Sequence, residues 1–350
     1  MKKTIRICIT LLLCTAIVAS TVGVLAFVQA LVMPKYMSFL TREGALIAEY
    51  YNETTTHDVI FVGDCEVYES FTPPTLWEEY GITSYIRGSA QQLTWQSYYL
   101  LEETFEIEQP KVVVFNVLAM KYGEPQNEQY NRMTLDGMKW SKIKLAAIKA
   151  SMTEEENLLS YLFPLLRFHS RWSELTKEDW KYLFTRDTVS HNGYLMQTGV
   201  KPRPESEREG IRLSDYTLPE TSFDYLDKMR ALCEENGAEL VLIKAPTNNW
   251  KYWWYDEWDE QIRAYAEEHD LDYYNFIGNE EIGIDWSTDT YDAGVHLNVY
   301  GAEKMTAYFG KILQEKYGLT DHRGDAALAK TWSEKLTAYN EEKKELESRK

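Results

Sequence analysis

The sequence predicts an α/β protein: a three-layer α/β/α sandwich with a parallel sheet, preceded by a membrane anchor. Three observations support this fold class. After residue 57, short apolar runs alternate with helical patterns, the order typical of a parallel sheet covered by helices. The strongest run, KVVVFNV at 111–117, is dominated by valine, which favours strands. Residues 7–33 contain no charged side chain.

The N-terminal segment predicts a single membrane-spanning helix. The apolar stretch 7–33 has 27 residues, more than the ~20 needed to cross a bilayer core of ~30 Å. Lys2, Lys3 and Arg6 precede it, which places the N-terminus in the cytoplasm and the body outside, on a single-pass plasma-membrane protein. A signal peptide cleaved after Ala30 is the alternative. We expect a retained anchor because a secretory apolar core has only ~7–15 residues.

The later segments are assigned in order along the chain. The interval 120–221 lacks strand patterns, has helical patterns at 140–152 and 154–166, and predicts a helical insertion over one edge of the sheet. The expected domains are a cytoplasmic tip (1–6), the anchor (7–33), a connector (34–56), the α/β domain (57–325, with the insertion 121–221) and a charged C-terminal helix (326–350). Strands are expected at 58–62, 82–86, 111–117, 239–245 and 272–276, and helices at 94–105, 223–236, 258–269 and 301–317.

Charge and cysteine content exclude several classes of protein. The chain has 37 Lys+Arg and 55 Asp+Glu, a net charge of −18, which argues against a nucleic-acid binder. The body contains only Cys65 and Cys233, so it is not a disulfide scaffold. The cysteines form no C-x-x-C pair and the six histidines are scattered. We therefore expect neither a metal site nor a cofactor.

Polar residues at the carboxyl ends of the expected strands predict where the chemistry lies, because ligands of an open parallel sheet bind there. Gly63-Asp64-Cys65 follows the first strand and Gly88 the second, while Asn116 ends the third. Asp292 and His296 precede the last long helix. Together they supply a nucleophile, oxyanion donors and an Asp/His pair, the groups of a catalytic triad.

These residues resemble the SGNH/GDSL hydrolase superfamily. Gly63-Asp64-Cys65 is similar to its G-D-S block with cysteine as the nucleophile, and Gly88 and Asn116 are similar to its second and third blocks. Asp292 and His296 are similar to the closing D-x-x-H block, with a spacing of four residues instead of three. The layout resembles the membrane-anchored DltD-like and alginate O-acetyltransferase-like branches. The resemblance implies a flavodoxin-like sheet and covers most of the body except the insertion.

The resemblance implies an acyltransferase or esterase that acts on O-acyl groups of a cell-envelope glycan or polymer, with a membrane-bound acyl exporter as a partner. His296 would deprotonate Cys65, which attacks the acyl carbonyl to give a thioester, while Asp292 orients the imidazole. The N–H groups of Cys65 and Gly88 and the amide of Asn116 would form the oxyanion hole. Asp289 is a rival for the role of Asp292. The sequence leaves hydrolysis and transfer both open.

Several other residues are candidates for substrate binding, and several readings compete with catalysis. An acidic body, with a net charge of −21 after residue 33, favours neutral glycans over acidic wall polymers. The main alternative to catalysis is that Cys65 is a core residue and the protein is a catalytically inactive binding or assembly factor. Another alternative is a redox pair of Cys65 with Cys233. An aromatic strip at 250–255 is expected by default to pack in the core, and if exposed it suits a sugar or the bilayer interface. The substrate-binding candidates are Lys244, Asn248, Arg87, His169, Arg171 and Trp172.

Overall fold

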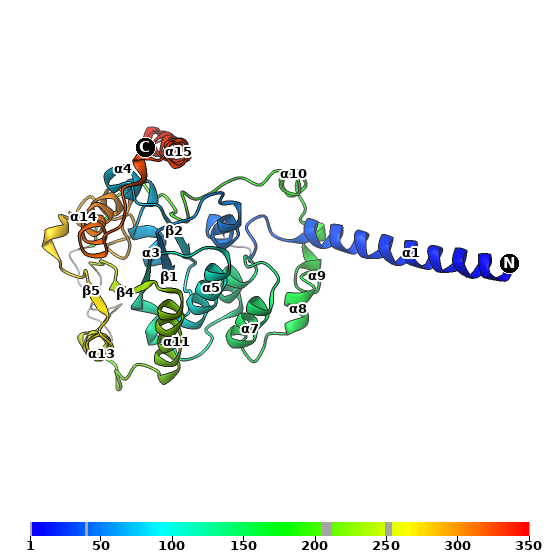
Figure 1. Ribbon diagram of the computed structural model, residues 1–350, viewed down its shortest axis with the longest axis horizontal. Helices are drawn as coiled ribbons and strands as arrows, with labels where there is room; N and C mark the ends of the chain where they lie inside the picture. The colour runs from blue at the N-terminus through cyan, green and yellow to red at the C-terminus, as the bar shows by residue number, and fades with distance from the viewer. Residues whose placement is uncertain (1, 39–40, 205–211, 249–253, 350) are drawn as a thin grey trace.

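The computed structural model describes residues 2–38, 41–204, 212–248 and 254–349 of the chain. The first element, helix α1 (Lys2–Val32), projects away from the body as an isolated rod (Figure 1). It is long and apolar enough to cross a bilayer, and its central part is fully exposed. This agrees with the expected N-terminal helix.

Five parallel strands form one sheet in the order β2-β1-β3-β4-β5. Each strand lies within one or two residues of the range that its apolar pattern predicted. The order changes direction at β1, which has β2 on one side and β3 on the other. Loops at the carboxyl ends of such neighbouring strands diverge and leave room for a ligand. The strands are β1 (Val59–Gly63), β2 (Ser84–Gly88), β3 (Val112–Asn116), β4 (Glu239–Lys244) and β5 (Asp272–Asn275).

Helices cover both faces of the sheet, as expected for α/β architecture (Figure 1). Alternate strand residues point to opposite faces, so Val59 and Phe61 join one apolar cluster and Ile60 and Val62 join the other. The first cluster is covered by α3 (Cys65–Ser70), α4 (Pro73–Tyr80) and α14 (Val299–Tyr317). The second is covered by α5 (Thr94–Ile107), α11 (Glu220–Asn236) and α13 (Asp256–Glu268).

Helices occupy the segment between β3 and α11 up to Tyr182, as predicted, but one of the expected helices is broken, and the described residues of 183–219 contain no helix. The helix expected at 154–166 is interrupted at Pro164, which has no N–H for a helical hydrogen bond and begins a new helix instead. The helix expected at 140–152 is present as α7. The segment contains α6 (Glu128–Leu135), α7 (Lys142–Ser151), α8 (Leu158–Leu162), α9 (Leu165–Phe168), the 3₁₀ helix η4 (His169–Ser173) and α10 (Lys177–Tyr182).

The end of this segment covers the exposed edge of the sheet. Strand β2 is an edge strand, and the backbone N–H of Ile86 donates to the carbonyl of Asn192 at 3.0 Å. Gly193 has a φ of +85°, and a Cβ there would lie 2.0 Å from the Ile86 carbonyl oxygen. Only glycine fits at this position. The contact protects backbone groups that an edge strand otherwise exposes.

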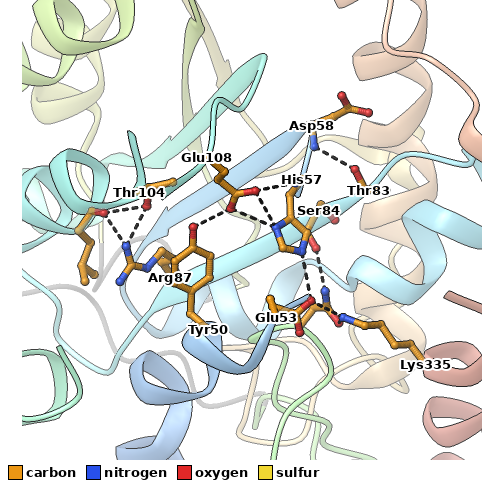
Figure 2. Close-up of polar contacts among 12 residues, drawn as sticks. Tyr50, Glu53, His57, Asp58, Thr83, Ser84, Arg87, Thr104, Glu108 and Lys335 are labelled. Carbon is orange, nitrogen blue, oxygen red and sulfur yellow. Dashed lines mark hydrogen bonds and ion pairs between the residues drawn. The ribbon is translucent and has the colours of Figure 1, made fainter. Parts of the chain in front are cut away.

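A buried polar cluster holds the segment before β1 and the C-terminal helix against the sheet (Figure 2). His57, only 3% exposed, lies with Nδ1 3.1 Å from both carboxylate oxygens of Glu108 and with Nε2 3.3 Å from Glu53. Tyr50 donates to Glu108 at 2.6 Å, and Lys335 of the C-terminal helix pairs with Glu53. Burial lowers the pKa of His57, but the two carboxylates outweigh it and raise that pKa.

The C-terminal helix α15 (Ala326–Ser348) is more than the charged, water-facing helix expected for 326–350. Its Trp332 and Tyr339 are buried, and Trp332 stacks on Trp77 of α4 with ring centroids 5.4 Å apart. The helix therefore belongs to the core packing of the body. The remaining short elements are η1 (Arg42–Ala45), α2 (Leu46–Glu49), η2 (Tyr50–Asn52), η3 (Val117–Lys121), η5 (Glu280–Ile282) and η6 (His322–Gly324).

Candidate active site

A cavity of about 320 Å³ lies at the carboxyl ends of β1, β2 and β3. Cys65 and His296 line it together with Lys121, Glu69 and Tyr291. The volume falls within the range of ~300–1,000 Å³ that small-molecule sites occupy. This position is the carboxyl edge of the sheet, where the polar residues at the strand ends predicted the chemistry.

A sharp turn from β1 into α3 presents Cys65 at the start of a helix. Gly63 has a φ of +149°, and a Cβ there would lie 2.6 Å from Cγ2 of Val67, so glycine is required. Asp64 is the N-cap residue, and its side chain accepts from the backbone N–H of Glu66 at 3.1 Å. Cys65 is the first residue of α3, where backbone N–H groups have no partner within the helix and the helix dipole favours negative charge.

Asp292 fixes both the backbone and the ring of His296. Oδ1 accepts from the His296 backbone N–H at 2.8 Å, and Oδ2 lies 2.6 Å from the ring Nδ1. The turn between them uses Ala293 and Gly294, which have φ values of +68° and +84°. These left-handed residues accommodate the four-residue spacing. Burial raises the pKa of Asp292, but the hydrogen bond and the charge of His296 outweigh it and hold that pKa below its usual value.

Asp289, the rival carboxylate, has other partners. Its Oδ2 accepts from Lys304 at 2.7 Å and from the backbone N–H of Asp285 at 2.8 Å. Asn298 next to the histidine loop is the N-cap of α14 and accepts from the N–H groups of Tyr300 and Gly301. Asp292 is therefore the carboxylate that contacts the histidine.

Cys65 and His296 line the same cavity and each shifts the pKa of the other, while the imidazole of His296 is bound to Asp292. Burial raises the pKa of Cys65, as do the carboxylates of Asp64 and Glu69, while His296 acts in the opposite direction. Burial lowers the pKa of His296, but the charges of Glu69 and Cys65 and the bond to Asp292 outweigh it and raise that pKa well above its usual value. At neutral pH these shifts favour a protonated imidazole.

Glu69 is a second carboxylate beside His296 that the sequence analysis missed. It lies one helical turn after Cys65 on α3, and its Oε2 is 3.4 Å from His296 Nδ1. Tyr291 donates to the same oxygen at 2.7 Å, and the Tyr291 ring is nearly parallel to the imidazole at 6.3 Å. Burial raises the pKa of Glu69 to about 7. The i, i+4 spacing from Cys65 was the signal that could have identified it.

A buried network beneath Cys65 engages Asn116 and Lys244. The Asn116 amide nitrogen donates to Asp64 Oδ1 and to Glu66 Oε2, both at 3.0 Å, which uses both of its hydrogens. Lys244 is fully buried and lies 2.8 Å from both oxygens of Glu66. Neither residue lines the cavity as described. The amide expected in the oxyanion hole and the lysine expected to bind substrate are therefore engaged in the network that supports the loop.

This network also sets the electrostatic environment of Asp64 and Glu66, the two acidic neighbours of Cys65. The charge of Glu66 is balanced by Lys244, so it does not act on the thiol as an unpaired carboxylate. Burial, together with the nearby charge of Glu66, raises the pKa of Asp64 to about 6, whereas Lys244 and Lys121 act in the opposite direction. Asp64 therefore remains largely a hydrogen-bond acceptor within the turn at neutral pH.

Neither Gly88, expected in the oxyanion hole, nor Arg87, expected to bind substrate, lines the cavity as described. Gly88 aligns with Gly63 in the sheet, and a Cβ on it would lie 3.1 Å from the Gly63 carbonyl oxygen, whereas Ala90 and Gln91, two and three residues later, line the cavity. Arg87 is fully buried, ion-paired with Glu103 at 2.6 Å, and stacked on Tyr50. Its guanidinium also donates to the Thr104 hydroxyl (Figure 2). Arg87 thus faces the other side of the sheet and has no access to substrate.

The remaining substrate-binding candidates lie elsewhere. The backbone of Asn248 anchors the histidine loop, because its N–H donates to the Gly294 carbonyl at 2.8 Å. His169, Arg171 and Trp172 belong to η4, which packs beside α1 and does not contribute to the cavity as described. In the aromatic strip expected at 250–255, Trp254 is buried in the core, and positions 250–253 lie outside the described residues.

Lys121 is the other cavity residue that the sequence analysis missed. It ends η3, directly after β3, and lines the cavity together with Asp64 and Cys65. Burial lowers its pKa, while the charges of Asp64 and Glu66 act in the opposite direction. A lysine five residues after a strand end carries no motif, so only its position at the carboxyl edge of the sheet could have indicated it.

Cys65 and Cys233 do not form the redox pair that the sequence left open. Cys65 and Cys233 are both free thiols, and they pack into the apolar clusters on opposite faces of the sheet, so the proposed pairing is wrong. Within the described residues, His, Cys, Asp and Glu side chains form no group suited to a metal ion.

Comparisons with known proteins add no family to this geometry. Neither the protein-family models nor the curated protein sequences gave a match to the chain.

Proposed function

We propose that the protein is an extracytoplasmic, membrane-anchored acyltransferase or esterase that acts on O-acyl groups of a cell-envelope glycan or polymer. The single observation that carries the proposal is that Cys65 and His296 line the same ligand-sized cavity while Asp292 binds the imidazole of His296. The G-D-C turn and its resemblance to SGNH/GDSL hydrolases support the same reaction class. A cysteine nucleophile, an imidazole base and an orienting carboxylate are the groups that acyl transfer requires.

In the first half of the proposed reaction, His296 removes the thiol proton of Cys65 and the sulfur attacks the ester carbonyl. The Asp292 contact at Nδ1 leaves Nε2 for this proton. The tetrahedral oxyanion forms near the N-terminus of α3, where the Cys65 N–H and the Lys121 ammonium can stabilise it. Collapse breaks the C–O bond, and the imidazolium returns its proton to the departing alkoxide.

In the second half, His296 deprotonates an incoming hydroxyl, which attacks the thioester carbonyl. The C–S bond breaks, and the sulfur leaves as a thiolate that regains the proton from the imidazolium. A sugar hydroxyl as acceptor gives transfer, and water gives hydrolysis. Because the cavity is partly open and has polar and aromatic walls, it accommodates an acyl group together with part of a sugar.

The location outside the membrane follows from the charges that flank α1. Lys3 and Arg6 at its start predict a cytoplasmic N-terminus, which places the body and the Cys65 cavity on the outer face. A substrate there belongs to the cell envelope. The strongly acidic body favours a neutral glycan, and the resemblance adds a membrane-bound acyl exporter as the source of acyl groups.

A catalytically inactive binding or assembly factor is the second candidate, and one observation favours it. The raised pKa values of Cys65 and His296 favour a neutral thiol next to a charged imidazole, and a charged imidazole cannot accept the thiol proton. In a protein that has lost turnover but kept its fold, this protonation state has no consequence, because no proton transfer is required.

Comparison of Cys65→Ser with Cys65→Ala separates the two candidates. The assay measures release of acetate from p-nitrophenyl acetate and from acetylated oligosaccharides by the full chain in detergent. The first candidate predicts activity in the wild type and none in Cys65→Ala. Serine retains hydrolysis if the site has ordinary hydrolase geometry. Equal rates in wild type and Cys65→Ala would exclude the proposed function.

A further inference from the structure

Helices α9 and α10 and the 3₁₀ helix η4 contact the body-proximal end of α1, and α8 lies next to α9 (Figure 1). We call residues 158–186 the collar. Arg171 donates to the carbonyl of Val32 at 2.9 Å, and the rings of Phe27 and Trp180 lie 6.2 Å apart. Through these contacts the collar is fixed to the last turns of α1.

The collar exposes large apolar side chains at high density. Seven of them have exposed fractions between 38% and 81% within a stretch of 29 residues, although its Tyr161 and Phe168 are buried. Elsewhere in the described body, outside α1, only Ile107, Trp140 and Val200 are comparably exposed. Such a concentration marks an interaction surface. The seven residues are Leu159, Leu162, Phe163, Leu166, Trp172, Trp180 and Phe184.

The charge of the collar differs from that of the rest of the body. It has five basic and three acidic residues, a net charge of +2, whereas the other residues after Met33 carry −23. Its Lys177 and Lys181 are exposed or half-buried beside the apolar side chains. Basic residues next to tryptophan and phenylalanine are typical of segments that lie in the headgroup region of a bilayer.

The length of α1 places the collar at this depth. A hydrocarbon core of ~30 Å takes up ~20 helical residues at 1.5 Å each. Counted from Ile7, the first residue after the basic cluster, the span ends near Ala26. Phe27 to Val32, which contact the collar, then lie in the headgroup layer. Tryptophan concentrates at that depth.

We propose that the collar is a membrane-interface platform whose exposed side chains insert among phospholipid headgroups and upper acyl chains. The inference rests on α1 being a retained anchor and is independent of acyl transfer. With α1 and the collar both in contact with lipid, the body is held at a fixed height and orientation instead of swinging on a single helix. The Cys65 cavity is thereby kept at a constant distance from the membrane surface.

Site-specific photocrosslinking in vesicles tests the platform. Photoreactive p-benzoyl-phenylalanine replaces Phe184 or Trp172, which are 81% and 76% exposed, so the fold should tolerate the change. The purified full chain is reconstituted in vesicles of phosphatidylcholine and phosphatidylglycerol, irradiated and analysed by mass spectrometry. The same probe at Leu12 in α1 reports anchoring, and probes at Ile107 and Val200 are the matched exposed controls.

Phospholipid adducts at positions 172, 184 and 12, with none at 107 and 200, are the expected result. Adducts at position 12 but none at 172 or 184 would overturn the platform and leave the anchor intact. No adduct at position 12 would overturn both the anchor and the inference. Crosslinked dimers of the chain at 172 and 184 in place of lipid adducts would show that the collar is a protein interface, which also contradicts the proposal.

Discussion

Asp292 lies 2.6 Å from Nδ1 of His296 through one carboxylate oxygen and 2.8 Å from the His296 backbone N–H through the other. The same carboxylate thus sets the turn of the loop and the orientation of the ring. Because Asp292 binds Nδ1, the second ring nitrogen is the one that would act on Cys65 in the proposed reaction. The geometry also makes the contribution of each carboxylate near the histidine testable.

Asp292→Asn should reduce kcat for acyl-ester turnover severely. The amide keeps a backbone contact but loses the charge and favours the wrong imidazole tautomer, a change that costs ~10⁴-fold in a serine triad. Steady-state kinetics of the full chain measure it. Asp289→Asn is the matched control because Asp289 contacts Lys304 instead of His296. Equal losses of kcat in the two variants would mean that Asp292 has no special role.

Activity should rise with pH above neutrality. The pKa of His296 is raised well above its usual value, so the imidazole is charged at neutral pH and becomes a base only as pH increases through that pKa. The raised pKa of Cys65 acts in the same direction, because the thiolate also forms at higher pH. A profile of log(kcat/KM) against pH checks the sign. A profile that falls between pH 7 and 9 without unfolding contradicts it.

Glu69→Gln should move this profile toward lower pH. The charge of Glu69 is the largest of the influences that raise the pKa of His296, and the neutral amide removes it while keeping the size of the side chain. We therefore treat Glu69 as a positioning residue that acts through the imidazole. Glu280→Gln, on an exposed side chain, is the control. An unshifted profile in Glu69→Gln would show that the carboxylate has only a structural role.

His57→Gln should destabilise the body, with the effect greatest in mildly acidic solution. Breaking a buried ion pair costs ~3–5 kcal/mol. The raised pKa of His57 means that its contribution is complete below its ordinary value of 6.5 and is lost as pH rises through the folded-state pKa. The lowered pKa values of Glu53 and Glu108 mean that their contribution is lost as pH falls below 4.5 through their folded-state values.

Urea unfolding of wild type and His57→Gln at several pH values measures this dependence. The difference in unfolding free energy should shrink as pH rises well above 6.5. His169→Gln, at an exposed position, should show no such difference at any pH. A destabilisation by His57→Gln that is constant from pH 5 to pH 9 would contradict the ionic role of the cluster.

Gly193→Ala should weaken the cover over the β2 edge. The new Cβ would clash with the Ile86 carbonyl, and alanine is strained at a φ of +85°. Residues in such backbone regions cost ~1–3 kcal/mol, and the clash adds to that cost. Gly324→Ala meets no atom within 4 Å at its Cβ and should leave the unfolding free energy nearly unchanged. Equal stability of the two variants would show that the edge contact is not needed.

Strand positions were predictable because buried parallel strands are nearly continuous apolar runs, as at 111–117. The placement of Cys65, Asp292 and His296 at one site was predictable because they follow strand ends or precede a helix, where the topology of the sheet brings loops together. Pro164 shows the limit of periodicity, since the apolar pattern continued through a residue that breaks the helix.

The other site residues depended on side-chain partners that a sequence does not specify. Arg87 lies next to Gly88, but alternation along β2 points it to the opposite face, where Glu103 binds it. Asn116 and Lys244 lie at the expected strand ends, but Asn116 binds the buried carboxylate of Asp64 and Lys244 binds that of Glu66. Glu69 and Lys121 line the cavity, but no motif marks either residue. Their positions depend on where α3 and η3 begin and end.

The most direct test of the central claim is the mass of the intact protein after reaction with a small acyl ester. The full chain in detergent is treated with p-nitrophenyl acetate at mildly alkaline pH, quenched in acid and digested to locate the adduct. A single acetyl group on Cys65, removed by hydroxylamine, absent from Cys65→Ala and formed slowly in His296→Ala, is the predicted result. An unmodified Cys65 in the wild type, or acetylation at the same rate in His296→Ala, would contradict a thioester mechanism.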